Sequence, residues 1–382
     1  MADAVAQLIE RERDPHASDS SLRYMPGLDM TRGLAILMVL CYHGIGDAVS
    51  VDVSLHQSLF HALSIFFGLG LYGVHLFFVL SGFLISGILI DNRLSAGYYR
   101  TFYLRRAARI LPAGVLMLLA LKAGSWISWR FFFAALLYVA NMPRLFGTTA
   151  EYGVWWSLAV EEQFYFVWPF VIRKCTRNAL LLVCVAIVLL TPLLRVALMG
   201  ASANWDIVQH KSWGVWDFFA AGALIAIAVR TPGYSVVLRR LFPWLVGVGG
   251  ALVMAWALVP QPQNRTALRF FFAGSLEPWL MLCCGLVILA FLRPSIATGV
   301  LAPGFLFLAK ISYGLYLCHS LIFQIICRHW VIPVDGSFGS LGLVVLRFAV
   351  EAALAIGVAA LSRWTIEEFF LRLKPKPAHG IA

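Results

Sequence analysis

Glu161 and Glu162 are adjacent carboxylates inside an otherwise apolar stretch, WWSLAVEEQFYFVW at 155–168. An ionised group at membrane depth is costly unless it is paired or lines a wet cavity, and this stretch contains no Lys or Arg. We therefore interpret one glutamate as a catalytic carboxylate. Because adjacent helical residues point about 100° apart, only one is expected to face a given reacting group, and the other can pair with a cation on another helix.

Arg32 and His43 are eleven residues apart in the first apolar stretch. On a helix they differ in direction by about 20° and lie roughly 16 Å apart along the axis, so they share one face. This spacing suits an arginine that binds an anion and a histidine that transfers a proton. The alternative is an arginine that only sets topology and a histidine satisfied by a backbone carbonyl. Asp29 can pair with Arg32 across one turn.

Arg105, Arg106 and Arg109 lie at the start of another apolar stretch. Basic residues are enriched at the cytoplasmic ends of spanning helices, so all three help to orient the chain. Guanidinium groups also bind phosphates through paired hydrogen bonds. Arg106 and Arg109 are three residues apart and can act together, so we predict that they bind an anionic group.

Other polar side chains lie within apolar stretches. Ser312, Tyr316 and His319 follow at intervals of four and three residues and form one polar stripe on a helix. His75 is open to a functional or a structural interpretation. The small residues of SGFLISG at 81–87 allow close approach of another helix.

The composition explains why these groups stand out. Of 382 residues, 61% are hydrophobic and only 13% are charged, and the mean hydropathy is +0.82. Soluble domains carry about 25% charged residues, so a soluble multidomain enzyme and a disordered chain are both excluded. The net charge of +11 can indicate nucleic-acid binding, but a membrane protein also gathers basic residues on its cytoplasmic loops.

Eleven apolar segments can be distinguished, and charge decides which of them span the membrane. The loops 92–109 and 173–178 are both rich in basic residues and are predicted to be cytoplasmic. The chain must cross an even number of times between them, although three apolar segments lie there. The shortest, 131–142, is therefore predicted to be interfacial or re-entrant, because a span needs about 17–25 residues. The ten predicted spans are 31–46, 72–91, 110–124, 155–172, 179–198, 213–229, 242–259, 276–292, 304–327 and 340–362.

With ten spans and both termini cytoplasmic, twenty of the thirty Lys and Arg residues lie on the cytoplasmic side and six lie outside. This asymmetry supports the orientation. The predicted fold is all-α, a polytopic transmembrane helical bundle in the inner (plasma) membrane. Its predicted parts are a cytoplasmic polar tail at 1–24, a membrane domain at 25–366 and a cytoplasmic tail at 367–382.

The cysteines and the single buried charges are predicted to be structural. The seven cysteines form no CxxC pair and mostly lie in or beside apolar runs, so we expect buried small hydrophobes rather than disulfides or metal ligands. No metal site is predicted. The single acids Asp217 and Glu351 are expected to pair with buried cations, from among Arg195, Lys310 and Arg347.

Together these motifs resemble the acyltransferase-3 family of integral membrane acyltransferases. The matching pieces, in the family's order, are Arg-x10-His at 32–43, FFVLSGFLI at 77–85, Arg-x-x-Arg at 106–109, WSL…EEQFY at 156–165, and SYGLY…H at 312–319. Two positions depart from the usual pattern. DMTR at 29–32 stands in place of Asp-Gly-Leu-Arg, and LCH at 317–319 stands in place of Leu-Trp-His, but neither change removes an ionisable residue.

The resemblance implies a ten-helix bundle that transfers an acyl group, most often acetyl, from cytoplasmic acyl-CoA to a hydroxyl of a carbohydrate or related acceptor. Acceptors in the family include surface polysaccharides, lipopolysaccharide, peptidoglycan and macrolide antibiotics. The expected partners are therefore acyl-CoA, a glycan or glycolipid acceptor and the lipid bilayer, and no nucleic acid.

The resulting hypothesis gives each candidate residue a role. His43 is the general base or a transient acyl carrier, and Glu161 or Glu162 orients its imidazole. The residues expected to hold the CoA phosphates are Arg32, Arg106 and Arg109. Those expected to orient the acceptor or donate to the oxyanion are Ser157, Tyr165 and His319.

Two other functions fit part of the pattern. A proton-coupled transporter also uses buried Glu, His and Arg, although the two halves of this chain share no detectable repeat. A haem-binding electron carrier could use His43, His75 or His319 as axial ligands, but it leaves the adjacent glutamates unexplained.

Overall fold

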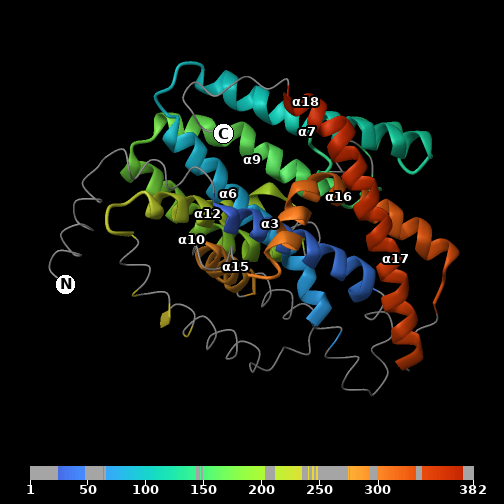
Figure 1. Cartoon of the computed structure of the whole chain (residues 1–382). Helices are drawn as coiled ribbons and strands as arrows, with labels where there is room; N and C mark the ends of the chain where they lie inside the picture. The colour runs from blue at the N-terminus through green and yellow to red at the C-terminus, as the bar shows by residue number, and fades with distance from the viewer. Residues whose placement is uncertain are drawn as a thin grey trace.

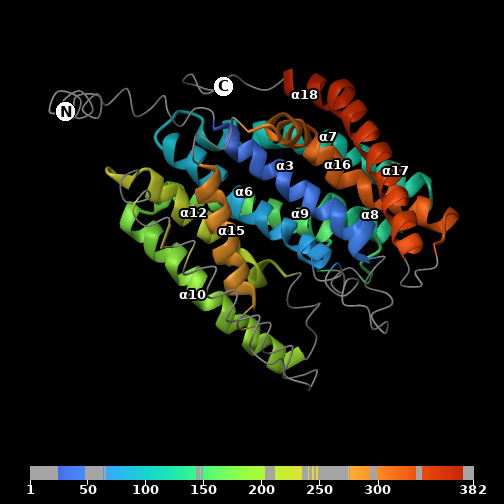
Figure 2. The same ribbon diagram turned by 60° about the horizontal axis from the view of Figure 1, so that its bottom comes forward.

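A computed structural model describes residues 25–47, 66–142, 149–202, 211–234, 276–292, 299–332 and 338–372, together with a few isolated positions between them. These residues form helices and turns, and no strand occurs among them. The prediction of an all-α bundle is confirmed. The principal helices, labelled in Figures 1 and 2, are α3 (Pro26–Cys41), α6 (Gly73–Asp91), α7 (Tyr98–Ala123), α8 (Trp129–Leu136), α9 (Trp155–Lys174), α10 (Arg177–Ser202), α12 (Trp216–Val229), α15 (Glu277–Phe291), α16 (Ala302–His329) and α17 (Phe338–Ser362).

Shorter elements extend several of these helices. A π-helix, Tyr42–Gly46, continues α3, and a 3-10 helix, Leu69–Tyr72, precedes α6. A second π-helix, Arg363–Glu367, continues α17 and leads into α18 (Glu368–Arg372). A further 3-10 turn, Ser212–Gly214, precedes α12. The π-helix after α3 carries His43, and the π-helix after α17 carries Arg363 and Glu367.

Five helical stretches are both long enough and apolar enough to cross a membrane: Pro26–Gly46, Phe66–Asp91, Arg177–Met199, Ala302–His329 and Phe338–Arg372. Two shorter apolar helices, α12 and α15, coincide with further predicted spans. The helices α7 and α9 have 26 and 20 residues, which is about 39 Å and about 30 Å of helix, but they carry several charged side chains and are less apolar. The predicted span 242–259 lies outside the described residues.

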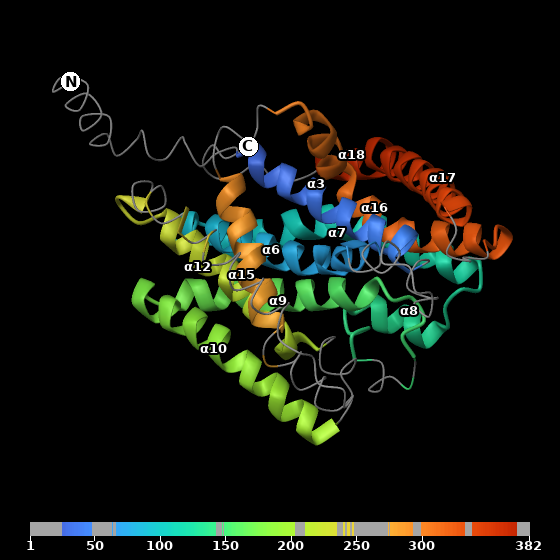
Figure 3. The same cartoon turned by 90° about the horizontal axis from the view of Figure 1, so that it is seen from below.

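Helix α6 lies at the centre of the bundle and contacts α3, α9, α12 and α15. Figures 2 and 3 show α10 and α17 on opposite sides of this centre. Helix α16 packs against α3 on one side and against α17 on the other. The chemistry-bearing helices α3, α6, α7, α9 and α16 therefore surround one interior region.

The basic connections predicted to be cytoplasmic meet at one end of the bundle. Arg93 donates hydrogen bonds to the backbone carbonyls of Arg173, at 3.2 Å, and of Cys175. Arg177 donates to the hydroxyl of Thr231 at 2.6 Å. The first contacts join the ends of α6 and α9, and the last joins the start of α10 to the residues after α12.

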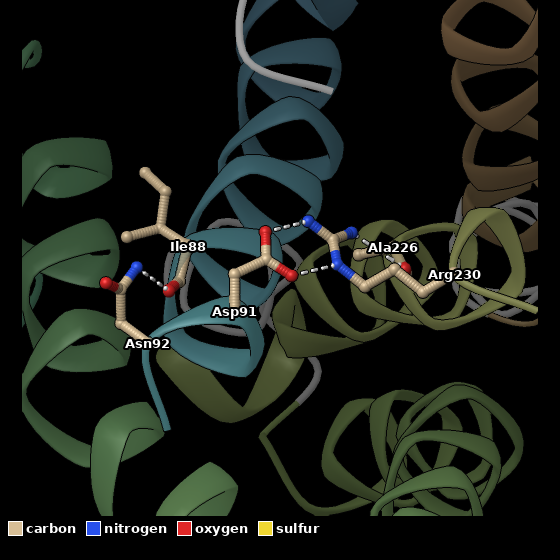
Figure 4. A network of polar contacts seen from close by, with 5 residues as sticks. All are labelled: Ile88, Asp91, Asn92, Ala226 and Arg230. Carbon is tan, nitrogen blue, oxygen red and sulfur yellow. Dashed lines mark hydrogen bonds and ion pairs between the residues drawn. The ribbon is translucent and has the colours of Figure 1, made fainter. Parts of the chain in front are cut away.

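Figure 4 shows a paired contact at the same end. Arg230 donates through Nε and Nη2 to the two carboxylate oxygens of Asp91, each at 2.6 Å, and through Nη1 to the carbonyl of Ala226. Asn92 donates its side-chain amide to the carbonyl of Ile88, which closes the end of α6. Side chains therefore join α6 and α12 at their ends, and the two helices also pack closely along their length.

That close packing depends on glycine. A Cβ atom added to Gly82 of α6 would lie 2.1 Å from the carbonyl oxygen of Phe219, and one added to Gly222 of α12 would lie 2.0 Å from that of Val79. Neither oxygen can move without displacing a helix. The close approach predicted for the 81–87 segment is therefore present at Gly82.

We expect Gly82→Ala to lower the unfolding free energy by about 1–3 kcal/mol, because the methyl group overpacks a helix–helix contact. Thermal unfolding in one detergent measures this change. Gly357→Ala on α17 is the matched control, since a Cβ there meets nothing within 4 Å. Alanine is the better helix former, so the control is expected to be neutral or slightly more stable. Equal responses of the two variants would show that the α6–α12 contact is not tight.

The segment predicted not to span contains only the eight-residue helix α8, about 12 Å long. Ser128 caps it by accepting from the Phe131 amide, and Glu151 accepts from both the amide and the hydroxyl of Ser128. After α8 the chain turns at Tyr138, with φ of +54°, and its carbonyl accepts a hydrogen bond from Gln163, near the middle of α9. The segment is too short to cross the bilayer, as predicted.

Candidate active site

A cavity of about 100 Å³ lies inside the bundle, between α3, α6, α7, α9 and α16. Its polar lining comes from separate sequence motifs: Arg32, Ser81, Arg106, Arg109, Ser157, Glu161, Glu162, Tyr165, Ser312, Tyr313 and Tyr316. Seven of the nine predicted site residues line it. The remaining two, His43 and His319, lie beyond its lining and are described below.

Three arginines reach this cavity from two helices. Arg32 of α3 pairs with Asp29 at 2.6 Å, as the spacing predicted, and it lines the cavity as well. Arg106 of α7 places its guanidinium 4.7 Å from the centre of the Tyr165 ring, a cation–π contact. Arg109 follows one turn later on the same helix. The cavity therefore has a positive wall that can hold an anionic group.

Both glutamates line the same cavity as the arginines. Glu161 accepts hydrogen bonds from the hydroxyl groups of Ser81 and Tyr165. The hydroxyl oxygens of Tyr165 and Ser81 lie 3.1 Å apart, so the three side chains form one compact polar cluster. Glu162 lines this cavity and a second, larger one beside it. The described hydrogen bonds of Glu161 therefore go to α6 and to its own helix, and none goes to His43.

His43 contacts a different carboxylate. Its Nδ1 lies 3.0 Å from Oδ2 of Asp47, one helical turn later, and its side chain is 37% exposed. An imidazole that donates from Nδ1 to a carboxylate keeps a lone pair on Nε2 and can accept a proton there. The sequence analysis missed Asp47, although its spacing of four residues from His43 was a usable signal.

His319 of α16 lies beside His43, with 5.3 Å between the ring centres. It is fully buried, and its Nδ1 donates to the carbonyls of Leu315 and Tyr316, at 3.1 and 2.8 Å. This arrangement fixes the Nδ1–H tautomer and leaves an acceptor at Nε2, which has no hydrogen-bond partner among the described residues. The two predicted histidines are therefore brought together.

Tyr316 lies between the histidines and the cavity. Its ring centre is 5.6 Å from that of His319, and its hydroxyl is 2.5 Å from that of Ser157. Both hydroxyl groups belong to residues that line the cavity. The cavity and the histidine pair thus form one continuous polar region, because Tyr316 contacts both.

Tyr152, in the connection before α9, positions the part of α16 that carries His319. Its hydroxyl donates to the carbonyl of Leu317 at 2.8 Å and accepts from the amide of Leu321 at 3.1 Å. Burial raises the pKa of Tyr152 well above its usual range, so the hydroxyl stays protonated and keeps donating.

Other buried charges pair away from this region. Arg195 and Asp217 form a fully buried ion pair at 2.8 Å, and Arg347 lies 3.4 Å from Glu351, so the predicted structural pairing of both acids is confirmed. His75, whose role the sequence left open, lies 3.5 Å from Glu277. None of these residues lines the cavity.

All seven cysteines lie within the residues that the structure describes. None of the seven cysteines is in a disulfide. Within the described residues, no three side chains of His, Cys, Asp or Glu gather as metal ligands. The polar region therefore offers arginines, carboxylates, hydroxyls and imidazoles as its chemical groups.

Comparison with known proteins identifies the family. The model of a family described as an acyltransferase domain matches residues 25–362. The chain belongs to the acyltransferase-3 family. The match includes every residue of the cavity and both histidines, so the resemblance drawn from the separate motifs is confirmed.

Several relatives of this acyltransferase-3 chain carry names for related activities. It is 29% identical over 194 residues to the peptidoglycan O-acetyltransferase of Listeria monocytogenes. The aligned segment covers 44% of this chain and 28% of that protein. It is 33% identical over 171 residues to a Bacillus subtilis protein named "Putative peptidoglycan O-acetyltransferase". This alignment covers 38% of this chain and 23% of that protein. The matched segments span about a quarter of these relatives. No solved structure matches the chain.

Proposed function

We propose that this protein is a membrane O-acyltransferase that moves an acetyl group from acetyl-CoA to a hydroxyl of a glycan. The observation that carries the proposal is one interior cavity that joins three arginines, two glutamates and several hydroxyl groups from five helices. Charged groups at such depth require pairing or a polar ligand. The family membership and the names of the relatives support the same reaction class.

Arg32, Arg106 and Arg109 are the proposed site for the phosphates of CoA. Guanidinium groups bind phosphate through paired, charge-assisted hydrogen bonds. Arg32 and His43 are roughly 16 Å apart along α3 and the π-helix that continues it, a distance suited to the pantetheine arm that carries the thioester. The basic end of the bundle is the proposed cytoplasmic face, where acyl-CoA is present, and both termini are proposed to lie there.

His43 is the proposed general base. It takes the proton from the acceptor hydroxyl, and the oxygen attacks the thioester carbonyl. The tetrahedral oxyanion then collapses, the C–S bond breaks, and the imidazolium returns its proton to the leaving thiolate. An acyl-histidine intermediate divides the same transfer into two steps.

Asp47 takes the orienting role that the sequence gave to Glu161 or Glu162. It is the carboxylate in contact with the His43 imidazole, and a carboxylate in that position stabilises the imidazolium that forms. Glu161 instead holds Ser81 and Tyr165 at the wall of the cavity. Hydroxyl groups of Ser157, Tyr165 and Tyr316 are the proposed donors to the oxyanion or to the acceptor. His319 lies beside His43 and has an Nε2 atom without a hydrogen-bond partner among the described residues.

The proposed acceptor class is a cell-surface or cell-wall glycan, because the relatives are named for peptidoglycan O-acetylation. The test is reconstitution of purified protein into vesicles with [acetyl-14C]acetyl-CoA and peptidoglycan fragments. Release of CoA together with label on the glycan supports the proposal. Absence of thioester cleavage, combined with proton-driven solute uptake, would replace it with transport.

Arg109→Gln is expected to raise the KM for acetyl-CoA about tenfold to a hundredfold, because a hydrogen bond to a charged group contributes about 1.5–3 kcal/mol. The kcat is expected to change less, since the phosphates are remote from the reacting carbon. Initial rates of CoA release measure both constants. Arg105→Gln is the control on the same helix, because Arg105 lines neither cavity. A raised KM in the control but not in Arg109→Gln would contradict the assignment.

A further inference from the structure

A second cavity, of about 710 Å³, lies directly beside the first. The two share Arg106, Ile110, Glu162 and Tyr165 as a common wall. The rest of the second cavity is mainly apolar and aromatic, lined among others by Phe102, Leu111, Leu137, Val139, Phe166 and Trp216. It is about seven times larger than the cavity that holds the candidate chemistry, and the proposed reaction leaves it unused.

This space exists because residues 129–142 do not cross the membrane. The helix α8 ends at Leu136, and the chain then turns at Tyr138. Gln163 of α9 fixes the turn by donating to the carbonyl of Tyr138 at 2.7 Å and to the side chain of Asn141 at 3.0 Å. Irregular backbone at membrane depth requires such partners. A full helix in this position would fill the gap between α7 and α9.

The mouth of the second cavity is apolar. Leu111, Leu137 and Phe166 line the cavity and are 40%, 63% and 68% exposed. Leu111 and Phe166 lie in the middle parts of α7 and α9, which places them against the hydrocarbon of a bilayer. A ligand that enters here comes from the lipid and carries its own apolar chain.

The inner end of the cavity is polar. Arg106, Glu162 and Gln163 lie there, and the first two also face the catalytic cavity. An amphiphile with its chain in the apolar part would place its head group against these residues. The carboxylate of Glu162 and the amide of Gln163 suit the hydroxyl groups of a sugar.

We propose that this second cavity binds the hydrocarbon chain of a lipid-linked glycan, so that the acceptor hydroxyl enters the catalytic cavity from the side, through the common wall. This inference rests on the proposed function and names the class of its acceptor. The chain anchors the acceptor in the lipid-facing groove, and Glu162 and Gln163 bind hydroxyl groups of its sugar.

The observations favour the acceptor over two other occupants. An acetyl donor, the kind for which the relatives are named, has a two-carbon acyl group that needs no space of this size. A bulk phospholipid is also an amphiphile with a polar head group, but it brings no sugar hydroxyl groups to Glu162 and Gln163. A lipid-linked glycan fits both the apolar part and the wall shared with the catalytic cavity.

The test compares one sugar in two forms, polyprenyl-diphosphate-linked N-acetylglucosamine and free N-acetylglucosamine, as acceptors for reconstituted protein. We expect the lipid-linked form to have the higher kcat/KM. Ala107→Phe, which fills the second cavity without lining the first, is expected to lower this kcat/KM roughly tenfold or more. Val139→Phe is a second filling variant from the opposite wall. Leu116→Phe is the control, because Leu116 is an exposed residue of α7 outside both cavities.

Cleavage of acetyl-CoA, measured without acceptor, tests the enzyme function separately from the binding of a lipid chain in the second cavity. Retained cleavage with a selective loss for the lipid-linked sugar supports the groove. Equal use of both sugars by the wild-type protein, or filling variants that leave the lipid-linked reaction unchanged, would overturn the groove and leave the enzyme function standing. Filling variants that instead change the preferred length of the donor's acyl chain would assign the cavity to the donor. Absence of any thioester cleavage by the wild-type protein would reject the enzyme function itself.

Discussion

Alanine in place of His43 is expected to lower acetyl transfer about a thousandfold in reconstituted vesicles. General acid–base catalysis by a positioned side chain contributes about 10²–10⁴-fold, and His43 is the exposed imidazole held by a carboxylate at this site. The loss is expected in kcat with little change in the KM for acetyl-CoA, because the arginines that bind the phosphates stay in place. Initial rates at saturating acetyl-CoA measure the effect.

His329→Ala is the matched control, since His329 is an exposed histidine at the end of α16, outside the cavity lining. Asp47→Asn is expected to lower kcat by a smaller factor and to leave folding intact, because it removes the charge beside the imidazole and keeps the size of the side chain. Added imidazole is expected to restore part of the activity of His43→Ala. Full activity of His43→Ala would remove His43 from the mechanism, and a normal kcat in Asp47→Asn would remove its orienting role.

Most residues of this site could be predicted from the sequence, because charged side chains are rare in segments that lie in a membrane. Arg32, Arg106 and Glu161 occur in three distant motifs, and each is a charged side chain in a segment whose surroundings are apolar. Such groups must be paired or face a polar cavity, so a small number of them already points to one interior region. The structure places all three on the lining of the same cavity.

The pairing between helices could not be predicted in the same way. Local periodicity gives the face of a helix on which a residue lies but not the height at which two helices meet. The sequence therefore left open which glutamate faces His43, whereas the structure pairs His43 with Asp47 and joins Glu161 to Ser81. Gln163 shows the same limit, because its hydrogen bond to Tyr138 depends on how deeply residues 137–142 enter the bundle.

Two Arg–Asp pairs offer a test of how burial changes the value of an ion pair. Arg195 and Asp217 join α10 to α12 and have no exposed side-chain surface. Arg230 and Asp91, shown in Figure 4, join α12 to α6 at one end of the bundle and are 18% and 38% exposed. Both pairs form close contacts, at 2.8 and 2.6 Å, so geometry alone does not separate them.

Arg195→Met is expected to lower the unfolding free energy by about 3–5 kcal/mol, because removing one partner leaves a buried charge uncompensated. Asp217 would lose the guanidinium, and the Gly214 carbonyl would lose its donor at 2.8 Å. Arg230→Met is expected to cost only about 0–1 kcal/mol, since water can solvate Asp91. Thermal or denaturant unfolding in one detergent compares the two variants. The double variant Arg195→Met/Asp217→Leu should recover part of the loss, because it removes both charges together. If Arg195→Met cost no more than Arg230→Met, the buried pair would not be a main source of stability in this half of the bundle.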